Sequence, residues 1–228
     1  FDVNLDAPAA ERFKEIASKY TDSMNALIQV VKDLLLPVYP NAVEVIDDFF
    51  GAMHHKLDQP YRDEIQGIAD ASGIPLGQIV MYNVIYEFLS ACTSIIAVDE
   101  NDSLYHVRNL DFGLWIGWDP VNHAWELSRA LSNNIVNIRW IKGGQVLYKS
   151  NNFAGFVGVY NGLKQGKFAL TANSRFGKDG ETGRNGMIKW LTGEMPDGKW
   201  MTWLARETME NANSYAEAKE HLMNTEML

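Results

Sequence analysis

The hydrophobic pattern of this 228-residue chain changes once, at Ala91/Cys92, and that change limits what it can fold into. Before the boundary, apolar residues recur at helical spacing, as in the stripe Met24, Leu27, Ile28, Val31, Leu34 and Leu35. After it, short runs rich in Ile, Val and Tyr alternate with Gly and Asn/Asp turns. We therefore expect an α+β chain, with a helical region over residues 1–91 and a strand-rich region over residues 92–228.

Helices are expected to begin near Asp6, Ser23, Asn41, Pro60 and Pro75, since each of these residue types favours a helix start. The last of them, to Leu89, is apolar on most sides, which is typical of a buried helix. Strands are expected around the turn 100–103, around Gly143-Gly144, and over 153–160 and 167–173. Helices return near Gly186 and Met201, and a capping box at Ser214 opens the last one.

Composition excludes several classes of protein. The net charge of -9 and pI near 5.0 argue against nucleic acid as a partner. No run reaches the roughly 20 apolar residues of a membrane span. The histidines lack metal-ligand spacing, so neither a metal site nor a cofactor is expected. The tripeptide Asn101-Asp102-Ser103 lies in a predicted turn and matches an N-glycosylation site at Asn101.

Cys92 is the only cysteine, so it serves either packing or chemistry. A hairpin turn centred between Asn101 and Asp102 would place Asp111 opposite Cys92, within about 5 Å between Cβ atoms. Arg108 would then face the other side of the hairpin. A bulge or a shift of one residue would be needed to bring Arg108 and Asp111 to the thiol together.

Two interpretations of these residues remain open. In one, Arg108 and Asp111 form an ordinary ion pair and Cys92 is a buried packing residue. In the other, Cys92 is a nucleophile, and its base is either His106 or, if the chain is cut after Ala91, its own α-amino group. Asp111 would then hold that ammonium, and Arg108 would hold the substrate or stabilise developing charge.

Several segments together resemble one family. The run CTSIIA begins at Cys92, and HVRNLDF follows from His106 to Phe112. FDVNLD at the start, IPLGQIVMYNVIYE before the cysteine, FAGFVG at 153–158 and LTANSRF ending at Phe176 accompany them. This combination, spanning essentially the whole chain, resembles the acid ceramidase and N-acylethanolamine acid amidase family. These enzymes belong to the choloylglycine-hydrolase-like branch of the N-terminal nucleophile hydrolases.

The resemblance implies a precursor that cleaves itself between Ala91 and Cys92 into a helical α-subunit, 1–91, and a catalytic β-subunit, which stay together as a heterodimer. It implies an αββα sandwich, partial in this chain, and a lysosomal, also secreted, glycoprotein. Cys92, Arg108 and Asp111 match the catalytic motif. The thiol would attack the amide carbonyl of an N-acyl lipid, ceramide rather than an N-acylethanolamine, because GLWIGW and LTANSRF are closer to the ceramidases.

Two departures from the family pattern bear on activity. The family usually has Glu where this chain has Ser174, which opens the alternative of a catalytically impaired lipid-binding relative. The family's β-subunit also continues beyond the position of Leu228, which predicts that this sequence is partial.

Contacts with the lipid are expected from four positions. Asn173 matches the family, Trp115 lies in a loop soon after Asp111, and Phe153 and Gly155 lie in FAGFVG, where glycine indicates close approach of a backbone or a ligand. The stripe from Met24 fits either a core-facing helix or peripheral contact with a membrane surface. An activator protein that presents the lipid is left open.

Overall fold

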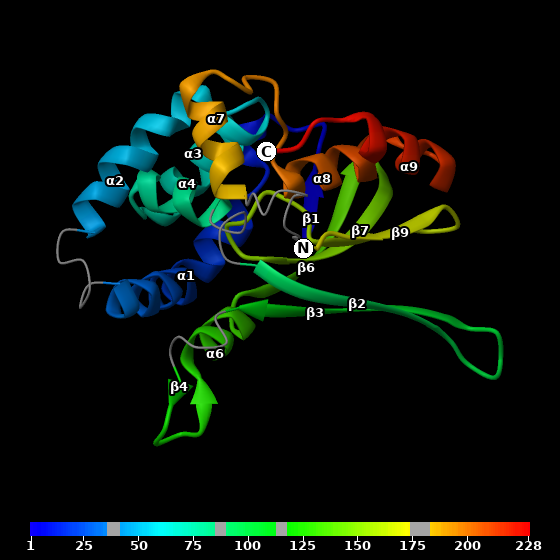
Figure 1. The fold of residues 1–228 in the computed structure, drawn as a ribbon, viewed down its shortest axis with the longest axis horizontal. Coiled ribbons are helices and arrows are strands. Elements are labelled where there is room, and N and C mark those ends of the chain that lie inside the picture. The colour runs from blue at the N-terminus through cyan, green and yellow to red at the C-terminus, as the bar shows by residue number, and fades with distance from the viewer. Residues whose placement is uncertain (36–41, 85–89, 113–117, 174–182) are drawn as a thin grey trace. The chain divides into compact units, whose positions relative to one another are not determined.

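The computed structural model describes residues 1–35, 42–84, 90–112, 118–173 and 183–228 (Figure 1). They form two compact units. The first comprises residues 1–85, 113–146 and 152–157, and the second comprises 86–112, 147–151 and 158–228. Among the described residues, no helix is both long enough and apolar enough to cross a membrane.

Helices make up most of the N-terminal part of the first unit. They are α1 (Lys14–Leu35), α2 (Ala42–Met53), α3 (Tyr61–Ser72) and α4 (Leu76–Val84), with short 3-10 turns η1 (Ala9–Glu11) and η2 (His54–Lys56). Helix α1 packs on α3, and α2 packs on α4. The expected boundaries of α3 are confirmed: Pro60 precedes it, and Gly73, at φ 70°, closes it by donating to the Ala69 carbonyl. The expected continuation of α4 to Leu89 lies outside the described residues.

The predicted helix start at Ser23 is wrong, because α1 runs through it. The Ser23 hydroxyl bonds within the helix, to the Tyr20 carbonyl at 3.1 Å, and also reaches Asn134 Oδ1 at 3.1 Å. Mid-helix serines commonly satisfy their hydroxyl in this way. Asp6 does not cap a helix either; its carboxylate accepts from the Gly143 amide at 2.6 Å.

The expected stripe on α1 faces the core over the part whose side chains are described: Met24, Leu27 and Ile28 are buried. Also in the first unit, β1 (Asp2–Asn4) pairs in parallel with β6 (Ile135–Lys142). After the turn at Gly143-Gly144 comes β7 (Gln145–Phe153), whose middle, 147–151, belongs to the second unit. The sequence pattern missed β1, the two-residue strands β4 (Trp118–Asp119) and β5 (Ala124–Trp125), and α6 (Glu126–Ser132).

The strand expected over 153–160 is also wrong, because β7 ends at Phe153 and Gly155 adopts φ 81°. Asn83 on α4 bonds this segment on both sides, donating to the Gly155 carbonyl at 2.9 Å and accepting from the Val157 amide at 2.8 Å. A Cβ on Gly155 would lie 2.5 Å from Met24 Cε. The close approach that the glycine indicated is therefore made by a side chain of α1.

The second unit contains the middle of β7 followed by β8 (Asn161–Lys164) and β9 (Phe168–Thr171), paired antiparallel in that order. Three helices follow: α7 (Gly183–Thr192), α8 (Met201–Asn211) and α9 (Tyr215–Asn224). The cap at Ser214 is confirmed, since its hydroxyl accepts from the Glu217 amide at 3.2 Å. The Glu217 carboxylate accepts from the amide of Asn213, one residue before the cap, at 2.8 Å.

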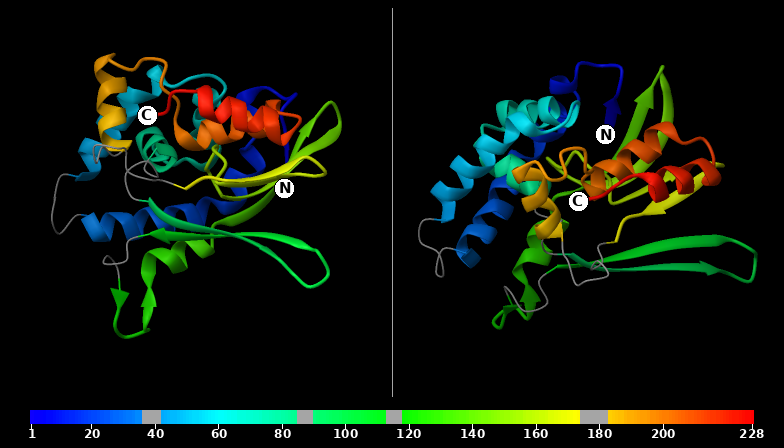
Figure 2. Two further views of the ribbon diagram at one scale, coloured as in Figure 1. Left: turned by 45° about the vertical axis from the view of Figure 1, so that its right-hand side comes forward. Right: turned by 45° about the horizontal axis from the view of Figure 1, so that its top comes forward.

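The second unit also carries a long antiparallel hairpin of β2 (Ser90–Val98) and β3 (Leu104–Phe112), shown in Figures 1 and 2. The hairpin itself was expected, but its register differs by one residue. Cys92 pairs with Leu110, and Asp111 pairs with Ala91. The predicted pairing of Asp111 with Cys92 is therefore wrong, because the turn is centred on Asn101 rather than between Asn101 and Asp102.

Candidate functional site

The shift of register brings Arg108 to the face of the hairpin that carries Cys92. Arg108 pairs with Ser94, and since side chains on a strand alternate between faces, Cys92, Ser94 and Arg108 lie on one side. Arg108 Nη2 donates to Cys92 Sγ at 3.0 Å. The sequence required a shift of one residue to bring Arg108 and Asp111 to the thiol together. The observed shift brings Arg108 to the face of Cys92, whereas Asp111 pairs with Ala91, one position away from Cys92.

The Arg108 guanidinium has two further contacts that fix its direction. Its Nε donates to Asn173 Oδ1 at 3.2 Å, and its Cζ lies 5.4 Å from the centroid of the Tyr160 ring, within range of a cation–π interaction. Asn173, predicted to contact the substrate, therefore lies in the same cluster. The residue Cys92 is neither fully buried nor fully exposed, and its sulfur has a cationic neighbour, which is the kind of environment found around reactive cysteines.

Hydroxyl groups extend the cluster behind Asn173. Ser94 Oγ lies 3.1 Å from Asn173 Oδ1 and 2.9 Å from its Nδ2, and it lies 2.9 Å from Thr171 Oγ1. Thr171 Oγ1 in turn lies 3.1 Å from His106 Nε2. Sequence reasoning missed Ser94 and Thr171. The available signal was that each lies two residues from a predicted site residue, Cys92 and Asn173 respectively, and so shares its side in an extended chain.

His106, one of the two bases considered for the thiol, pairs with Ile96, further along the hairpin than Cys92. The hydrogen bond described for its ring is the one to Thr171. His106 thus belongs to the polar cluster through Thr171, at the end away from the sulfur.

The remaining predicted residues are placed as follows. The backbone of Asp111 lies opposite Ala91, next to the Ala91-Cys92 peptide bond. Trp115 lies outside the described residues. Phe153 and Gly155 belong to the first unit, whereas Cys92 belongs to the second. Asn101 is exposed in the hairpin turn, where its side chain is accessible.

Beyond the polar cluster the hairpin is apolar and exposed on both faces. The exposed side chains are Ile95, Ile96, Val98, Leu104, Tyr105 and Val107, with Ile96 exposed to 67%. Several large apolar side chains exposed on one hairpin form the kind of surface that commonly marks an interaction or ligand-binding site. Within the described ranges, His, Cys, Asp and Glu side chains form no group of metal-binding size.

Comparisons with known proteins identify the family of the chain. The family model for linear amide C-N hydrolases of the choloylglycine hydrolase family matches residues 92–228, and the model for the beta subunit of N-acylethanolamine-hydrolyzing acid amidase matches residues 1–57. The chain belongs to the choloylglycine hydrolase family of linear amide C-N hydrolases. The expected α+β fold class, part of an N-terminal nucleophile hydrolase with a helical N-terminal region, is thereby confirmed.

Among individual proteins, the chain is similar to acid ceramidases. It is 34% identical over 230 residues to acid ceramidase of Homo sapiens and 34% identical over 228 residues to that of Mus musculus. These alignments cover 100% and 99% of this chain but 58% and 57% of those proteins, so the chain spans less than two thirds of the relatives it matches. A solved N-acylethanolamine-hydrolyzing acid amidase ortholog of Caenorhabditis elegans matches with a TM-score of 0.40 and 22% identity, over 58% of this chain and 48% of that chain.

Proposed function

We propose that this chain carries the nucleophile of a cysteine amidohydrolase that cleaves the amide bond of N-acyl lipids, ceramide first, into a fatty acid and sphingosine. The observation that carries the proposal is the hydrogen bond from Arg108 to the sulfur of Cys92, at the residue where the amide-hydrolase family model begins. The similarity to acid ceramidases over the whole chain supports ceramide as the substrate.

Activation is proposed to be cleavage between Ala91 and Cys92. The Cys92 sulfur attacks the Ala91 carbonyl carbon, the peptide C–N bond breaks, and a thioester joins the two parts. Water hydrolyses the thioester, leaving a carboxylate on Ala91 and a free α-amine on Cys92. Residues 1–91 and the part beginning at Cys92 then remain associated as α- and β-subunits. The start of the family model at residue 92 supports this boundary.

The new amine supplies the base, because an α-amino group has a reference pKa of about 7.7–8.0 and sits on the same residue as the thiol. It takes the thiol proton as the sulfur attacks the lipid amide, and returns it to the leaving sphingosine amine. Water then hydrolyses the acyl-thioester. Arg108 stabilises negative charge on the sulfur and on the tetrahedral oxygen. Asp111, whose backbone lies beside Ala91 in the register, is proposed to hold the ammonium.

The exposed apolar side chains on the hairpin that bears Cys92 support an acyl lipid as the substrate, because they offer apolar surface close to the nucleophile. Trp115, Phe153 and Gly155 remain proposed lipid contacts. The similarity to acid ceramidases is the basis for four further proposals. They are peripheral binding to a membrane surface, an activator protein that presents the lipid, a lysosomal or secreted location, and glycosylation of the exposed Asn101.

Cys92→Ala in the full-length protein tests the proposal. We expect a single uncut chain that releases no fatty acid from N-acyl sphingosine, while the wild type yields a fragment whose N-terminal residue is Cys92. N-terminal sequencing and fatty-acid release are the measurements. Cutting that persists in Cys92→Ala would rule out self-processing by this thiol. A wild type that binds ceramide without hydrolysing it would favour the impaired relative suggested by Ser174.

A second substrate is favoured by one observation, the match of residues 1–57 to the N-acylethanolamine acid amidase beta-subunit model. Palmitoylethanolamide would then be the better substrate. The ratio of kcat/KM for ceramide and palmitoylethanolamide in the same preparation decides between the two.

A further inference from the structure

The described contacts of Asn173 raise the question of what orients its amide. An arginine side chain only donates hydrogen bonds, so Arg108 Nε requires the oxygen of Asn173, not its nitrogen. If the amide were flipped, its NH2 group would face the guanidinium and two donors would meet. Asn173 itself therefore needs a partner that distinguishes its oxygen from its nitrogen.

Ser94 and Thr171 supply that distinction. Asn173 Nδ2 donates to Ser94 Oγ at 2.9 Å, and Ser94 Oγ also lies 3.1 Å from Asn173 Oδ1. The Ser94 hydroxyl lies 2.9 Å from Thr171 Oγ1, which lies 3.1 Å from His106 Nε2. When the single Ser94 proton points to Thr171, Ser94 Oγ can only accept from Asn173, and this selects the amide nitrogen. When His106 Nε2 acts as an acceptor, each donor in this series finds one acceptor. Arg108 donates to Asn173, Asn173 to Ser94, Ser94 to Thr171, and Thr171 to the His106 nitrogen.

We propose that Ser94 and Thr171 are positioning residues that hold the Asn173 oxygen toward Arg108 and thereby keep the guanidinium on the Cys92 sulfur. They act through other residues, since the sulfur contact itself is made by Arg108 Nη2 at 3.0 Å. The inference rests on the proposed role of Cys92 as the nucleophile. All the residues involved belong to the second unit, so the chain of contacts is complete within it.

Removing either hydroxyl weakens the distinction between the two orientations of the Asn173 amide. Without Ser94 Oγ, Asn173 Nδ2 loses its acceptor, and without Thr171 Oγ1, the Ser94 proton is free to turn toward Asn173. Arg108 then spends less time on the sulfur. Arg108 stabilises charge during the reaction and does not bind the lipid. Removing either hydroxyl should therefore lower kcat and the reactivity of the Cys92 thiol, and KM should change little.

The test compares Thr171→Val and Ser94→Ala with two hydroxyl-keeping variants, Thr171→Ser and Ser94→Thr. The matched control is Thr93→Val, which removes a hydroxyl from an exposed position on the opposite face of β2, where Thr93 pairs with Asn109. The rate of Cys92 alkylation by iodoacetamide is followed by mass spectrometry of its peptide in the full-length protein. In parallel, kcat and KM are measured on N-acyl sphingosine.

We expect Thr171→Val and Ser94→Ala to lower the alkylation rate and kcat by about 3- to 10-fold, the size expected for one hydrogen bond. KM should stay within about 2-fold, and Thr171→Ser, Ser94→Thr and Thr93→Val should behave as the wild type. Equal loss in the Val and Ser variants at position 171, or equal loss in Thr93→Val, would overturn the inference. If the wild type hydrolyses no N-acyl lipid, the proposed function fails, and the alkylation rates alone decide whether Ser94 and Thr171 position Arg108.

Discussion

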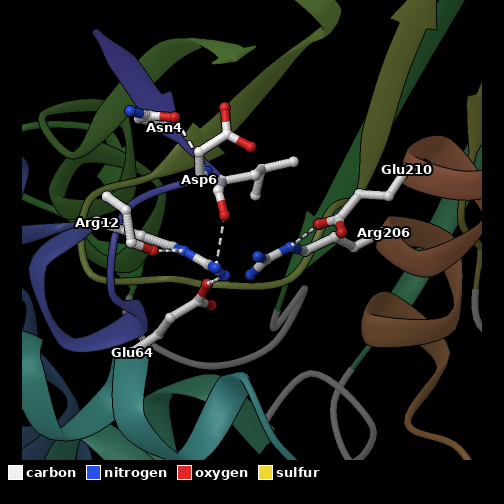
Figure 3. Close-up of polar contacts among 8 residues, drawn as sticks. Asn4, Asp6, Arg12, Glu64, Arg206 and Glu210 are labelled. Atoms are coloured by element: carbon white, nitrogen blue, oxygen red, sulfur yellow. Dashed lines mark hydrogen bonds and ion pairs between the residues drawn. The ribbon is translucent and has the colours of Figure 1, made fainter. Parts of the chain in front are cut away.

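Two arginines, Arg12 in the first unit and Arg108 in the second, make different kinds of contact. Arg12 donates to the Glu64 carboxylate at 2.9 Å and to the carbonyls of Leu5 and Ala7 at 2.7 and 3.0 Å (Figure 3). Glu64 is fully buried and Arg12 is 14% exposed. Arg108 contacts a thiol, an amide oxygen and the face of a phenol ring, beside a sulfur that is partly accessible.

The difference separates a structural role from a chemical one. Arg12 donates only to protein oxygen atoms in its described contacts, and one of them belongs to a fully buried carboxylate, whose charge is costly to bury without ion pairs. Arg108 directs one nitrogen at a group that is able to react. The second unit has its own structural arginine, Arg206, which is fully buried and bonded to Glu210 at 2.7 Å. A buried ion pair is thus common to both units, and the sulfur contact distinguishes Arg108.

Removing Arg12 should produce the largest loss of stability. Arg12→Met removes the Arg12 ion pair from the buried Glu64 carboxylate, and this lowers the free energy of unfolding by about 3–5 kcal/mol. Urea unfolding measures it. Arg139→Met is the matched control: Arg139 binds Asp2 at 2.6 Å on the surface, with side chains 57% and 48% exposed, so its loss costs less than about 1 kcal/mol. Equal destabilisation by the two variants would mean that the buried Arg12 pair contributes no more to stability than the exposed Arg139 pair.

Replacing Arg108 should reverse the pattern, with a large effect on chemistry and a small one on stability. Arg108→Met removes the donor to the Cys92 sulfur and lowers kcat on N-acyl sphingosine by about 10²- to 10³-fold. Arg108→Lys keeps the charge but cannot contact Asn173 and the sulfur through one rigid fork, so it recovers only part of the rate. Steady-state kinetics and urea unfolding are the measurements. An Arg108→Met protein with unchanged kcat would show that this arginine is structural, like Arg12.

Part of the fold was accessible from the sequence. Periodicity is a local property, so the helical N-terminal region and the hairpin around the turn 100–103 followed from neighbouring residues. The register did not follow, because one residue more or less in the turn decides it. Here the Asp99 carboxylate accepts from the amides of Asn101 and Ser103, both at 2.9 Å, and Asp102 takes φ 59°.

The polar cluster was harder to predict, since its members come from distant parts of the chain. Thr171 lies 77 residues after Ser94, and nothing in the sequence between them fixes their contact. A serine and a threonine in strands are common residues with no chemical signature of their own. Asn173 was expected only because the family has an asparagine there. Arg12 and Glu64, 52 residues apart, were missed for the same reason.

The smallest effect is expected at the turn of the hairpin. A substitution there tests whether the reactivity of Cys92 depends on the turn that joins β2 and β3. Hydrogen bonds from Ser103 and Asn101 hold the pKa of Asp99 below its ordinary value of 3.8. A lowered pKa in the folded state means that the carboxylate stabilises the turn above pH about 4, and that this contribution is lost as the pH falls through the folded value. At pH 5 the turn therefore keeps its full contribution from Asp99.

Asp99→Ala removes these bonds and should lower stability slightly at pH 5, with a difference from the wild type that shrinks as the pH falls through the lowered pKa of the folded carboxyl. Thermal unfolding across this pH range measures it. The rate of Cys92 alkylation should stay unchanged, because Arg108 is held by Asn173, which lies outside the hairpin. If the alkylation rate fell as far as it does in Thr171→Val, the turn would be among the groups that orient Arg108. The chemical role of Arg108 would then depend on the whole hairpin, and not only on the residues that contact it.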